Sequence, residues 1–235
     1  MNLLILNPED FTGSGVVHVT GRRLRHMIEV RRAKLGDTVA VGLLGGALGL
    51  GRIIRLDGEA LEMTVELHRE PPPKLPLTLV LALPRPVTLN RIMATATTLG
   101  VARIFLVNAW KVDKSYWYSP ALAQENLVMN QILGLEQSMD TRLPEVHLRR
   151  LLRPFAEDEL PDLIRGTLPL LAHPGAALPC PRTVQEPVTL VIGPEAGFIP
   201  QEVDLLARSG CQPVHLGPRI LRVETALSVL VGRLF

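Results

Sequence analysis

The chain has 235 residues and is close to neutral, because 25 lysines and arginines face 23 aspartates and glutamates. Hydrophobic residues make up 47% of the sequence, which excludes a disordered chain and suffices for one large domain or two modest ones. No stretch resembles the ~20 apolar residues of a membrane span, and the amino-terminal segment lacks the features of a signal peptide. The two cysteines, Cys180 and Cys211, lie outside any metal-binding spacing. We therefore expect a cytoplasmic protein without a membrane segment, a disulfide scaffold or a metal site.

A proline-rich segment, residues 71–76, divides the chain into two parts of different character. Polyproline continues neither a helix nor a central strand, so this segment is predicted to be a semi-rigid linker. In residues 1–70, short β-type runs alternate with turn residues, which favours a small, mostly antiparallel barrel. The predicted elements are strands at Leu3–Leu6, Val16–Thr20, Thr38–Val41, Gly51–Leu56 and Leu61–Leu67, and a helix at Arg22–Val30.

Residues 77–235 alternate between strand-like and helix-like segments. The alternation predicts an α/β domain around a mostly parallel sheet, whose buried strands are short and nearly continuously apolar. The predicted strands are Leu77–Leu83, Arg103–Asn108, Leu168–Ala172, Val188–Ile192 and Pro213–Leu216. The predicted helices are Thr88–Leu99, Pro120–Ser138, Pro200–Ser209 and Glu224–Phe235.

Two segments follow predicted strands and carry residues suited to ligand binding. Val191–Phe198 (VIGPEAGF) leads into a helix, and its glycines allow the backbone to approach a ligand closely. Leu216–Ala226 (LGPRILRVETA) also runs from a strand end into a helix. Ligands of α/β sheets bind at the carboxyl ends of the strands, where both segments fall. Taken alone, the first segment is compatible with an ordinary turn between a strand and a helix. Taken alone, the second is compatible with a loop in which Arg219 and Arg222 are surface charges and Glu224 caps a helix.

Together, the two segments closely resemble the family that methylates uridine N3 in small-subunit (16S) ribosomal RNA, which belongs to the SPOUT superfamily of knotted methyltransferases. The family pattern is GPEGGF followed by LGxRILRTETA, and Ala196 and Val223 depart from it. Weaker matches at Leu171–Pro174, Arg142–Glu145 and residues 26–37 extend the resemblance over nearly the whole chain.

Two further segments, Thr95–Gly100 and Ser138–Arg142, depart from the family pattern, and these departures leave the RNA target open. The resemblance implies three regions: a PUA-like RNA-binding barrel at residues 1–70, the linker at 71–76, and a SPOUT methyltransferase domain at 77–235. It also implies that a parallel sheet in the last region carries a trefoil knot.

The same resemblance implies S-adenosylmethionine as the methyl donor, bound by three loops of the knot. Ile220 and Leu221 would line an apolar slot for its adenine, and Glu195 or Glu224 would face its sulfonium. The implied cofactor-binding residues are Leu171, Ala172, His173, Pro174, Gly193, Pro194, Glu195, Gly197, Phe198, Leu216, Gly217, Ile220, Leu221, Arg222, Thr225 and Ala226.

The chemistry of the implied reaction points to a cation in the site. Uracil N3 must lose its proton to become a nucleophile, and an arginine beside O2 or O4 would stabilise the anion as the charge develops. Arg222 is the first candidate and Arg219 the second, and Glu195 is the third expected catalytic residue. The general base stays open, because His26 and His173 qualify only by residue type.

A local concentration of basic residues precedes the linker and is opposed only by Glu29. Such a patch suits phosphate contacts, although a solvated helix face has the same composition. The expected RNA-binding residues are Arg22, Arg23, Arg25, Arg31, Arg32 and Lys34. Both tryptophans and both tyrosines lie in Trp110–Tyr118, a segment equally suited to stacking on RNA bases and to a protein interface.

The final helix, Glu224–Phe235, is apolar on most sides and must be buried in the core or against a partner. Because the resembled enzymes are homodimers, we expect a homodimer that acts on ribosomal RNA or on the small ribosomal subunit. Two alternatives remain: a non-catalytic RNA-binding protein of the same fold, and a methyltransferase for a different RNA. Cofactor affinity separates the first alternative from an enzyme.

Overall fold

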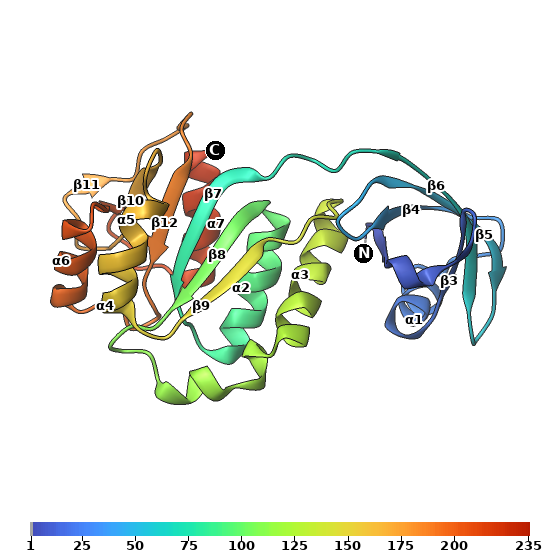
Figure 1. The fold of residues 1–235 in the computed structure, drawn as a ribbon, viewed down its shortest axis with the longest axis horizontal. Helices are drawn as coiled ribbons and strands as arrows, with labels where there is room; N and C mark the ends of the chain where they lie inside the picture. Colours follow the sequence, from blue (N-terminus) through green and yellow to red (C-terminus); the bar gives the residue numbers. More distant parts are fainter. Residues whose placement is uncertain (1) are drawn as a thin grey trace. The chain divides into compact units, whose positions relative to one another are not determined.

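A computed structural model describes residues 2–235 of the chain (Figure 1). The chain forms two compact units, each of which gathers two separate stretches of sequence. The first unit comprises Met1–Pro73 and Ile132–Leu143, and the second comprises Lys74–Gln131 and Pro144–Phe235. The stretch Ile132–Leu143, which the sequence analysis assigned to the region after the linker, therefore belongs to the first unit.

A curled, mixed sheet of six strands forms the first unit. Its order is β1-β4-β5-β6-β3-β2, in which β1 pairs with β4 in parallel and the other neighbours are antiparallel. Its elements are β1 (Leu4–Leu6), η1 (Pro8–Asp10), β2 (Phe11–Gly13), β3 (Val16–Val19), α1 (Gly21–Glu29), β4 (Thr38–Leu43), β5 (Leu48–Leu56) and β6 (Leu61–Arg69). The mostly antiparallel character is confirmed, but the pairings among the described residues end at β1 and β2 and do not close a barrel.

Strand β5 begins at Leu48, three residues before the predicted start, because glycine here serves a close approach rather than a turn. A Cβ atom on Gly49 would lie 1.8 Å from the carbonyl oxygen of Glu66 on β6. The register of β5 against β6 also shifts between Leu48 and Gly49. Only glycine fits between the two backbones at this irregularity, and a glycine-rich sequence gave no strand signal.

The second unit is an α/β domain around a seven-stranded sheet, as the sequence predicts. The order is β11-β13-β10-β12-β7-β8-β9, and every pairing is parallel. Its strands are β7 (Leu75–Ala82), β8 (Val101–Val107), β9 (Glu145–Arg149), β10 (Leu168–Ala172), β11 (Leu178–Pro179), β12 (Val188–Ile192) and β13 (Gln212–His215). Strands β10 and β12 have the predicted bounds.

The helices of the second unit lie on both faces of this sheet, with α4 and α5 on one face and α2 and α7 on the other (Figure 1). Helix α7 packs against α2 and buries Leu227, Leu230 and Leu234, so the final helix finds most of its partners within its own chain. The helical elements are α2 (Pro86–Thr98), η2 (Lys114–Tyr118), η3 (Pro120–Leu122), α3 (Gln124–Ser138), α4 (Leu152–Pro154), η4 (Phe155–Glu159), α5 (Leu160–Leu163), α6 (Pro200–Arg208) and α7 (Val223–Leu234).

Strand β9 and the helical run from α4 to α5 are not among the elements predicted from the sequence. Strand β9 lies at the edge of the sheet, and its charged and polar residues lack the apolar run of a buried strand. The helical run contains Pro154 and Pro161 and passes through a π-helical turn at Phe155–Glu159. These features remove the regular 3.6-residue period on which helix prediction depends.

Two buried carboxylates anchor the arginines at the start of α1. Asp10 is 6% exposed and accepts hydrogen bonds from the Arg23 guanidinium, with Nη2 to Oδ1 at 2.7 Å. Glu136 is 3% exposed, and its two oxygens accept bonds from Arg22 at 2.7 and 3.1 Å. Because both carboxylates are buried, each arginine neutralises a charge that would be costly without it.

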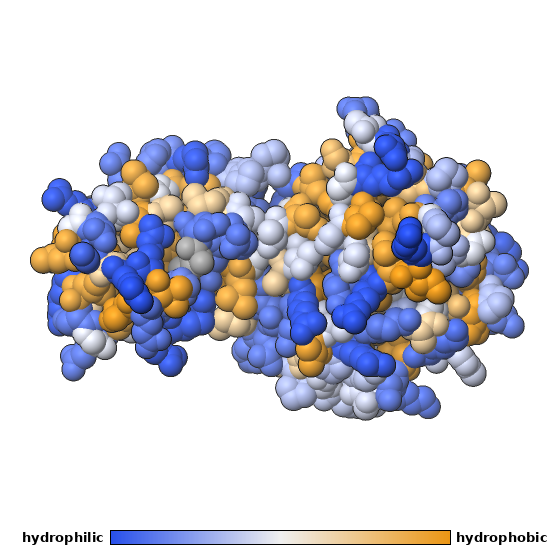
Figure 2. All heavy atoms as spheres, turned by 180° about the vertical axis from the view of Figure 1, so that it is seen from behind, coloured by the Kyte–Doolittle hydropathy of each residue, from blue (hydrophilic) through white to orange (hydrophobic). Residues whose placement is uncertain are grey.

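The surface of both units is mixed in character. On the face that Figure 2 shows, hydrophilic and apolar residues are interspersed over each unit. Within residues 2–235, the structure has no helix of the length and hydropathy that crossing a bilayer requires.

The Arg23–Asp10 pair yields a prediction about stability. Replacing Arg23 with Ala leaves the Asp10 carboxylate buried without its cation, so the free energy of unfolding should fall by about 3 kcal/mol. The matched control is Arg25→Ala, which removes an exposed arginine from the same helix and should change stability by less than ~0.5 kcal/mol. Urea denaturation followed by circular dichroism measures both, and equal stability of the two variants would contradict the structural role of Arg23.

Candidate functional site

The carboxyl ends of three neighbouring parallel strands form one cavity in the second unit. Strands β12, β10 and β13 are adjacent, with Ala172 paired to Ile192 on one side and to Val214 on the other. The loops that follow the three strands therefore emerge at one edge of the sheet, where ligands of α/β folds bind. They enclose a cavity of about 810 Å³, within the usual size range of small-molecule sites.

The cavity brings together most of the site residues that the sequence predicts. These residues are Ala172, His173, Pro174, Gly193, Pro194, Glu195, Gly197, Phe198, Leu216, Gly217, Arg219, Ile220, Leu221, Arg222 and Ala226. Two predicted residues are not among its lining. Leu171 is fully buried within β10, and Thr225 is exposed on the first turn of α7.

The sequence analysis missed a fourth side of the cavity. Arg85, Thr88 and Arg91 line it from the start of α2 and the loop before that helix. Strand β7 ends at Ala82 beside β12, so this loop leaves the same edge of the sheet as the other three. The sequence did predict a strand followed by a helix here, and that placement was the available signal. Glu224, which was expected as one of two carboxylates facing a sulfonium, also lines the cavity. The other lining residues beyond the predicted set are Ile192, Ala196, Val214, His215, Val223 and Leu230.

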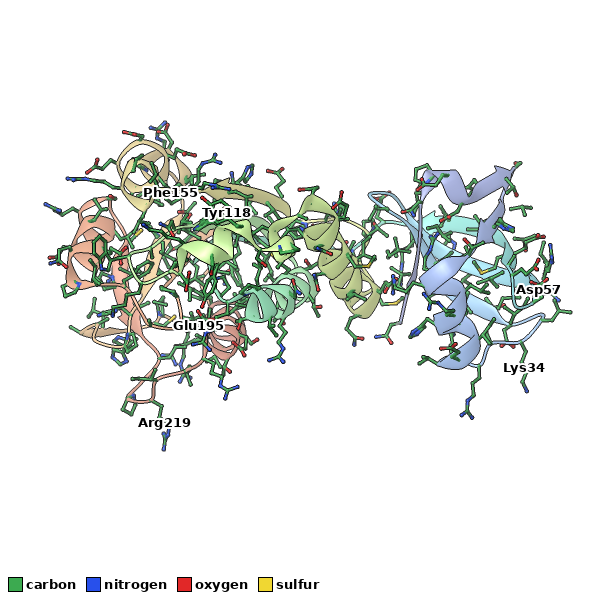
Figure 3. The ribbon with its side chains drawn as sticks, turned by 90° about the horizontal axis from the view of Figure 1, so that it is seen from below. Lys34, Asp57, Tyr118, Phe155, Glu195 and Arg219 are labelled. Atoms are coloured by element: carbon green, nitrogen blue, oxygen red, sulfur yellow. The ribbon has the colours of Figure 1, made fainter. Side chains whose placement is uncertain are left out.

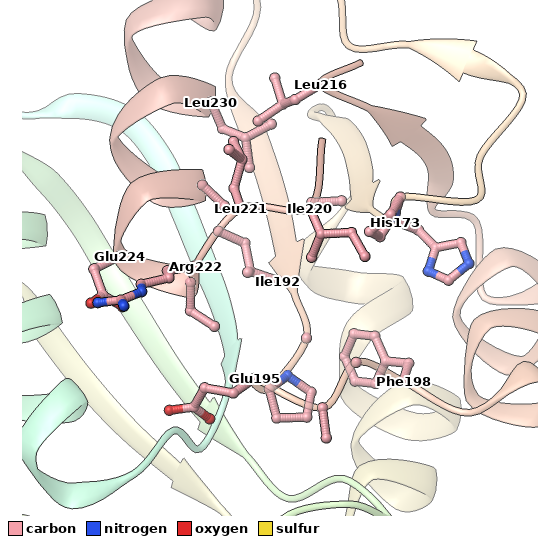
Figure 4. A pocket seen from close by; sticks show the side chains of 18 of the residues that line it. His173, Ile192, Glu195, Phe198, Leu216, Ile220, Leu221, Arg222, Glu224 and Leu230 are labelled. Atoms are coloured by element: carbon pink, nitrogen blue, oxygen red, sulfur yellow. The ribbon is translucent and has the colours of Figure 1, made fainter. Parts of the chain in front are cut away.

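Apolar and charged groups lie in different parts of the cavity lining. Ile192, Leu216, Leu221 and Leu230 gather in one region, as the close view in Figure 4 shows. Glu195 lies on a different side of the cavity from these residues (Figure 4). One region can therefore take an apolar ring, while the other offers a carboxylate to a cationic group.

Gly193 sets the distance between the β12 loop and the aromatic ring of Phe198. A Cβ atom on Gly193 would lie 3.0 Å from Cδ2 and 3.2 Å from Cε2 of that ring. Phe198 is buried, so it has little room to yield. The absence of a side chain at Gly193 thus lets the phenyl ring close one wall of the cavity against the backbone.

Two other glycines in the loops have backbone angles that L-residues rarely adopt. Gly197 has a φ of +70° and donates its N–H to the Pro194 carbonyl at 2.8 Å, which closes the turn. Gly217 has a φ of +109° and donates its N–H to Nδ1 of His215 at 2.9 Å. Any side chain at these positions would strain the loops that form the cavity.

Glu202, at the start of α6, fixes two loops at once. Its Oε2 accepts the N–H of Ile199 at 3.0 Å, and its Oε1 accepts the N–H of Trp110 at 2.7 Å. The carboxylate is 9% exposed. The β12 loop is thereby tied to the segment that follows β8, although the two lie far apart in sequence.

Two more hydrogen bonds join the β12 loop to its neighbours. Oε1 of Glu195 accepts the backbone N–H of Arg85 at 3.1 Å, and Nζ of Lys111 donates to the Ala196 carbonyl at 2.9 Å. Glu195 itself is exposed, so its carboxylate is accessible from the cavity.

The two candidate arginines differ in their placement. Arg222 is the residue immediately before α7, and its carbonyl accepts the N–H of Ala226 at 2.8 Å, so the helix fixes its backbone. Arg219 lies in the middle of the exposed loop, and its side chain points away from the rest of the second unit (Figure 3). The geometry therefore favours Arg222 over Arg219 as a group that acts inside the cavity.

The two candidate histidines also differ. His173 lines the cavity, whereas His26 lies on α1 in the first unit and does not line it. Burial lowers the pKa of His26 below its ordinary value.

The two cysteines are buried, and burial raises the pKa of Cys211 to about 12 and that of Cys180 above its usual range. Both thiols are therefore protonated at neutral pH and are not nucleophiles.

The basic cluster of the first unit divides into two sets. Arg22 and Arg23 are held by Glu136 and Asp10, as described above. The exposed members are Arg25, Arg31, Arg32 and Lys34. In this segment Arg32 has a φ of +52°, and the Lys34 N–H donates to the Asp37 carboxylate at 2.8 Å. Sequence showed the charge of Arg22 and Arg23 but not their partners.

The aromatic segment after β8 is likewise partly buried and partly exposed. Trp117 is 7% exposed and donates its indole N–H to Asn108 at 2.9 Å, whereas Trp110 is 80% exposed and Tyr118 is 78% exposed. The Arg150 guanidinium lies 5.5 Å from the centre of the Tyr118 ring.

Among residues 2–235, no group of three or more histidine, cysteine, aspartate or glutamate side chains is arranged to hold a metal ion.

Comparisons with known proteins agree with this geometry. A family model described as an RNA methyltransferase domain matches residues 70–234. The chain is 30% identical to ribosomal RNA small subunit methyltransferase E of Treponema pallidum, over 96% of this chain and 87% of that protein. It is 27% identical to the protein of the same name from Synechocystis, over 98% of this chain and 76% of that protein.

Solved structures share the fold. A Legionella pneumophila protein described as a methyltransferase, solved with the bound cofactor SAM, superposes with a TM-score of 0.74 and 25% identity, over 97% of this chain and 96% of that one. A ribosomal RNA small subunit methyltransferase E of Neisseria gonorrhoeae, bound to S-adenosyl methionine, gives a TM-score of 0.73 at 21% identity, over 98% and 95% of the two chains.

Proposed function

Since the chain belongs to the family of ribosomal RNA small subunit methyltransferases E, we propose that it transfers a methyl group from S-adenosylmethionine to N3 of a uridine in small-subunit ribosomal RNA. The observation that carries the proposal is the cavity of about 810 Å³, which unites the GPEAGF and LGPRILRVETA segments at one edge of a parallel sheet. The family and its relatives, two of them solved with bound S-adenosylmethionine, bear out the cofactor, the enzyme class and the ribosomal RNA substrate that the sequence predicts.

The residues present fit S-adenosylmethionine in size and in chemistry. Ile192, Leu216, Leu221 and Leu230 form the apolar region for the adenine ring, and Ile220, 84% exposed, stands on the loop that would close over it. Gly193 leaves the wall at Phe198 free of a side chain. Exposed Glu195 and half-buried Glu224 are the carboxylates that favour a positively charged sulfonium. When bound, this cofactor supplies an electrophilic methyl group.

The chain's own residues then have to raise the reactivity of the uridine. Loss of the N3 proton places negative charge on the uracil oxygens, and a fixed cation lowers the free energy of that charge. Arg222 has the required position on the cavity wall at the start of α7, with Arg219 as the second candidate. Holding the base in line with the methyl group contributes the remaining rate enhancement.

The same assignment extends to architecture and assembly. We infer a trefoil knot in the second unit; the placement of α7 against α2, after a loop that leaves β13, supports it. We also infer that the curled sheet of the first unit acts as the PUA-like RNA-binding module. A homodimer in the cytoplasm completes the proposal. It is supported by two exposed apolar side chains, Val229 within α7 and Phe235 directly after it, and sedimentation velocity measures the oligomeric state.

The cofactor site is tested by substituting its wall glycine. Gly193→Val places methyl groups against the Phe198 ring, so the affinity for S-adenosylmethionine should fall at least about tenfold, or 1.4 kcal/mol. Titration calorimetry measures it. The matched control is Gly232→Val, because a Cβ at Gly232 meets no atom within 4 Å, and this variant should bind like the wild type. No binding of S-adenosylmethionine to the wild-type protein, alone or with RNA, would refute the proposed function.

The role of Arg222 is tested by single-turnover methyl transfer to small-subunit RNA. Arg222→Ala should slow the reaction by about 10²–10³-fold, the usual cost of removing one group that stabilises a developing anion. Arg219→Ala should have a much smaller effect, because that side chain points away from the unit. Full turnover by Arg222→Ala would remove Arg222 from the mechanism, and mapping of N3-methyluridine in the product identifies the target.

The exposed basic cluster of the first unit makes a separate prediction about RNA affinity. Replacing Arg25 with Ala removes one exposed cation, so the slope of log affinity against log salt should become shallower by about one. Filter binding at a series of salt concentrations measures this slope. An unchanged slope for variants at Arg25, Arg31, Arg32 and Lys34 would show that this surface does not contact phosphates.

A further inference from the structure

A second, smaller cavity adjoins the proposed cofactor site. It has a volume of about 200 Å³ and shares four lining residues with the larger cavity: Arg85, Pro194, Glu195 and Ala196. Leu83, Val112 and Tyr116 contribute to its walls, and Lys111 lies at its side. Pockets for drug-sized ligands span about 300–1,000 Å³, so this cavity is suited to a single ring rather than a whole cofactor.

Lys111 and Glu195 give this cavity both donors and an acceptor. The Lys111 ammonium uses one N–H to bond the Ala196 carbonyl at 2.9 Å, and two further donors remain for a ligand. Oε1 of Glu195 accepts the Arg85 N–H at 3.1 Å, whereas no hydrogen bond to its Oε2 is found among the described residues. Tyr116 also lines the cavity, and a tyrosine hydroxyl can donate a further hydrogen bond.

We propose that this smaller cavity receives the target base, an unpaired uracil, and that Lys111 and Tyr116 select it. The proposal rests on the proposed function, which places the methyl donor in the adjoining cavity. Uracil presents two carbonyl oxygens on either side of an N3–H donor. Lys111 donates to O4 and Tyr116 to O2, and each oxygen keeps a second lone pair for Arg222 from the adjoining cavity. Oε2 of Glu195 accepts the N3–H bond and receives the proton when N3 is deprotonated.

Cytosine does not satisfy the same groups. It carries an amino donor in place of O4 and an unprotonated N3, so it would set donor against donor at Lys111 and acceptor against acceptor at Glu195. Once a bound base covers these groups, a mismatched edge would leave them without partners, and discrimination by such contacts is stronger than discrimination by shape. The cavity therefore selects the base by its hydrogen-bonding edge.

The surface beside the cavity suits RNA rather than a second copy of the chain. Trp110 is 80% exposed and directly precedes Lys111, and Glu202 accepts its backbone N–H. The indole is therefore accessible to a neighbouring base beside the cavity. Lysines, which are depleted from protein interfaces, flank this indole at Lys111 and Lys114. Asp113 is engaged as a cap, accepting the Ser115 N–H at 2.8 Å.

Binding of two single-stranded RNA decamers, one of uridine and one of cytidine, tests the proposal at a fixed salt concentration. The wild-type protein should bind the uridine decamer about tenfold more tightly. Lys111→Met should reduce this ratio to near one, and Tyr116→Phe should reduce it in part. The matched control is Lys114→Met, which removes an equal charge outside both cavities and should weaken both decamers equally while keeping the ratio.

The outcomes separate this proposal from the proposed function. Equal affinity of the wild type for both decamers, or an unchanged ratio in Lys111→Met, would overturn the uracil site even if S-adenosylmethionine binds normally. Calorimetry with S-adenosylmethionine tests the other arm on the wild-type protein, and failure of the wild type to bind it would overturn the proposed function instead. Trp110→Ala should weaken both decamers alike, and conversion of a dimer to a monomer with RNA binding intact would assign Trp110 to a protein interface.

Discussion

The proposed site depends on the parallel register of β12, β10 and β13. Ala172, Ile192 and Val214 stand side by side at the ends of these strands, so the loops that follow are delivered to one edge of the sheet. Nothing within any single loop would create the cavity. The register is maintained by side chains that are almost completely buried, such as Leu170, Leu190 and Val214, so the packing of the core determines where the ligand-binding loops lie.

A small number of side chains fix the loops at this edge of the sheet and so define the shape of the site. Glu202 bonds the β12 loop and the segment after β8 with one buried carboxylate, and Glu195 and Lys111 add two more connections to that loop. Gly193 allows Phe198 to pack against the backbone from the other side. Preorganised loops of this kind lose less entropy when a ligand binds, which is where a rigid scaffold contributes to affinity.

Sequence predicts those parts of the molecule whose signal is local. Strands β10 and β12 were predicted to the residue because a short, nearly continuous apolar run is a signal in itself, and the cavity loops were identified from two motifs. Contacts between distant segments left no such signal. Arg22 and Arg23 read as an exposed patch until Glu136 and Asp10 were placed beside them. The predicted strand at Gly51–Leu56 leaves Gly49 out, although the missing side chain of Gly49 is what lets β5 approach β6.

Arg85 and Lys111 show the same limit at the site itself. Neither belongs to a motif, and each reaches the β12 loop only because β7 and β8 end at the same edge of the sheet as β12. The GPEAGF loop contributes Pro194, Glu195 and Ala196 to both cavities, so it lies between them. The larger cavity adds the LGPRILRVETA loop, whereas the smaller cavity adds residues that follow β7 and β8: Leu83, Lys111, Val112 and Tyr116. One loop shared by two adjoining cavities is what the transfer of a group from a donor to an acceptor requires.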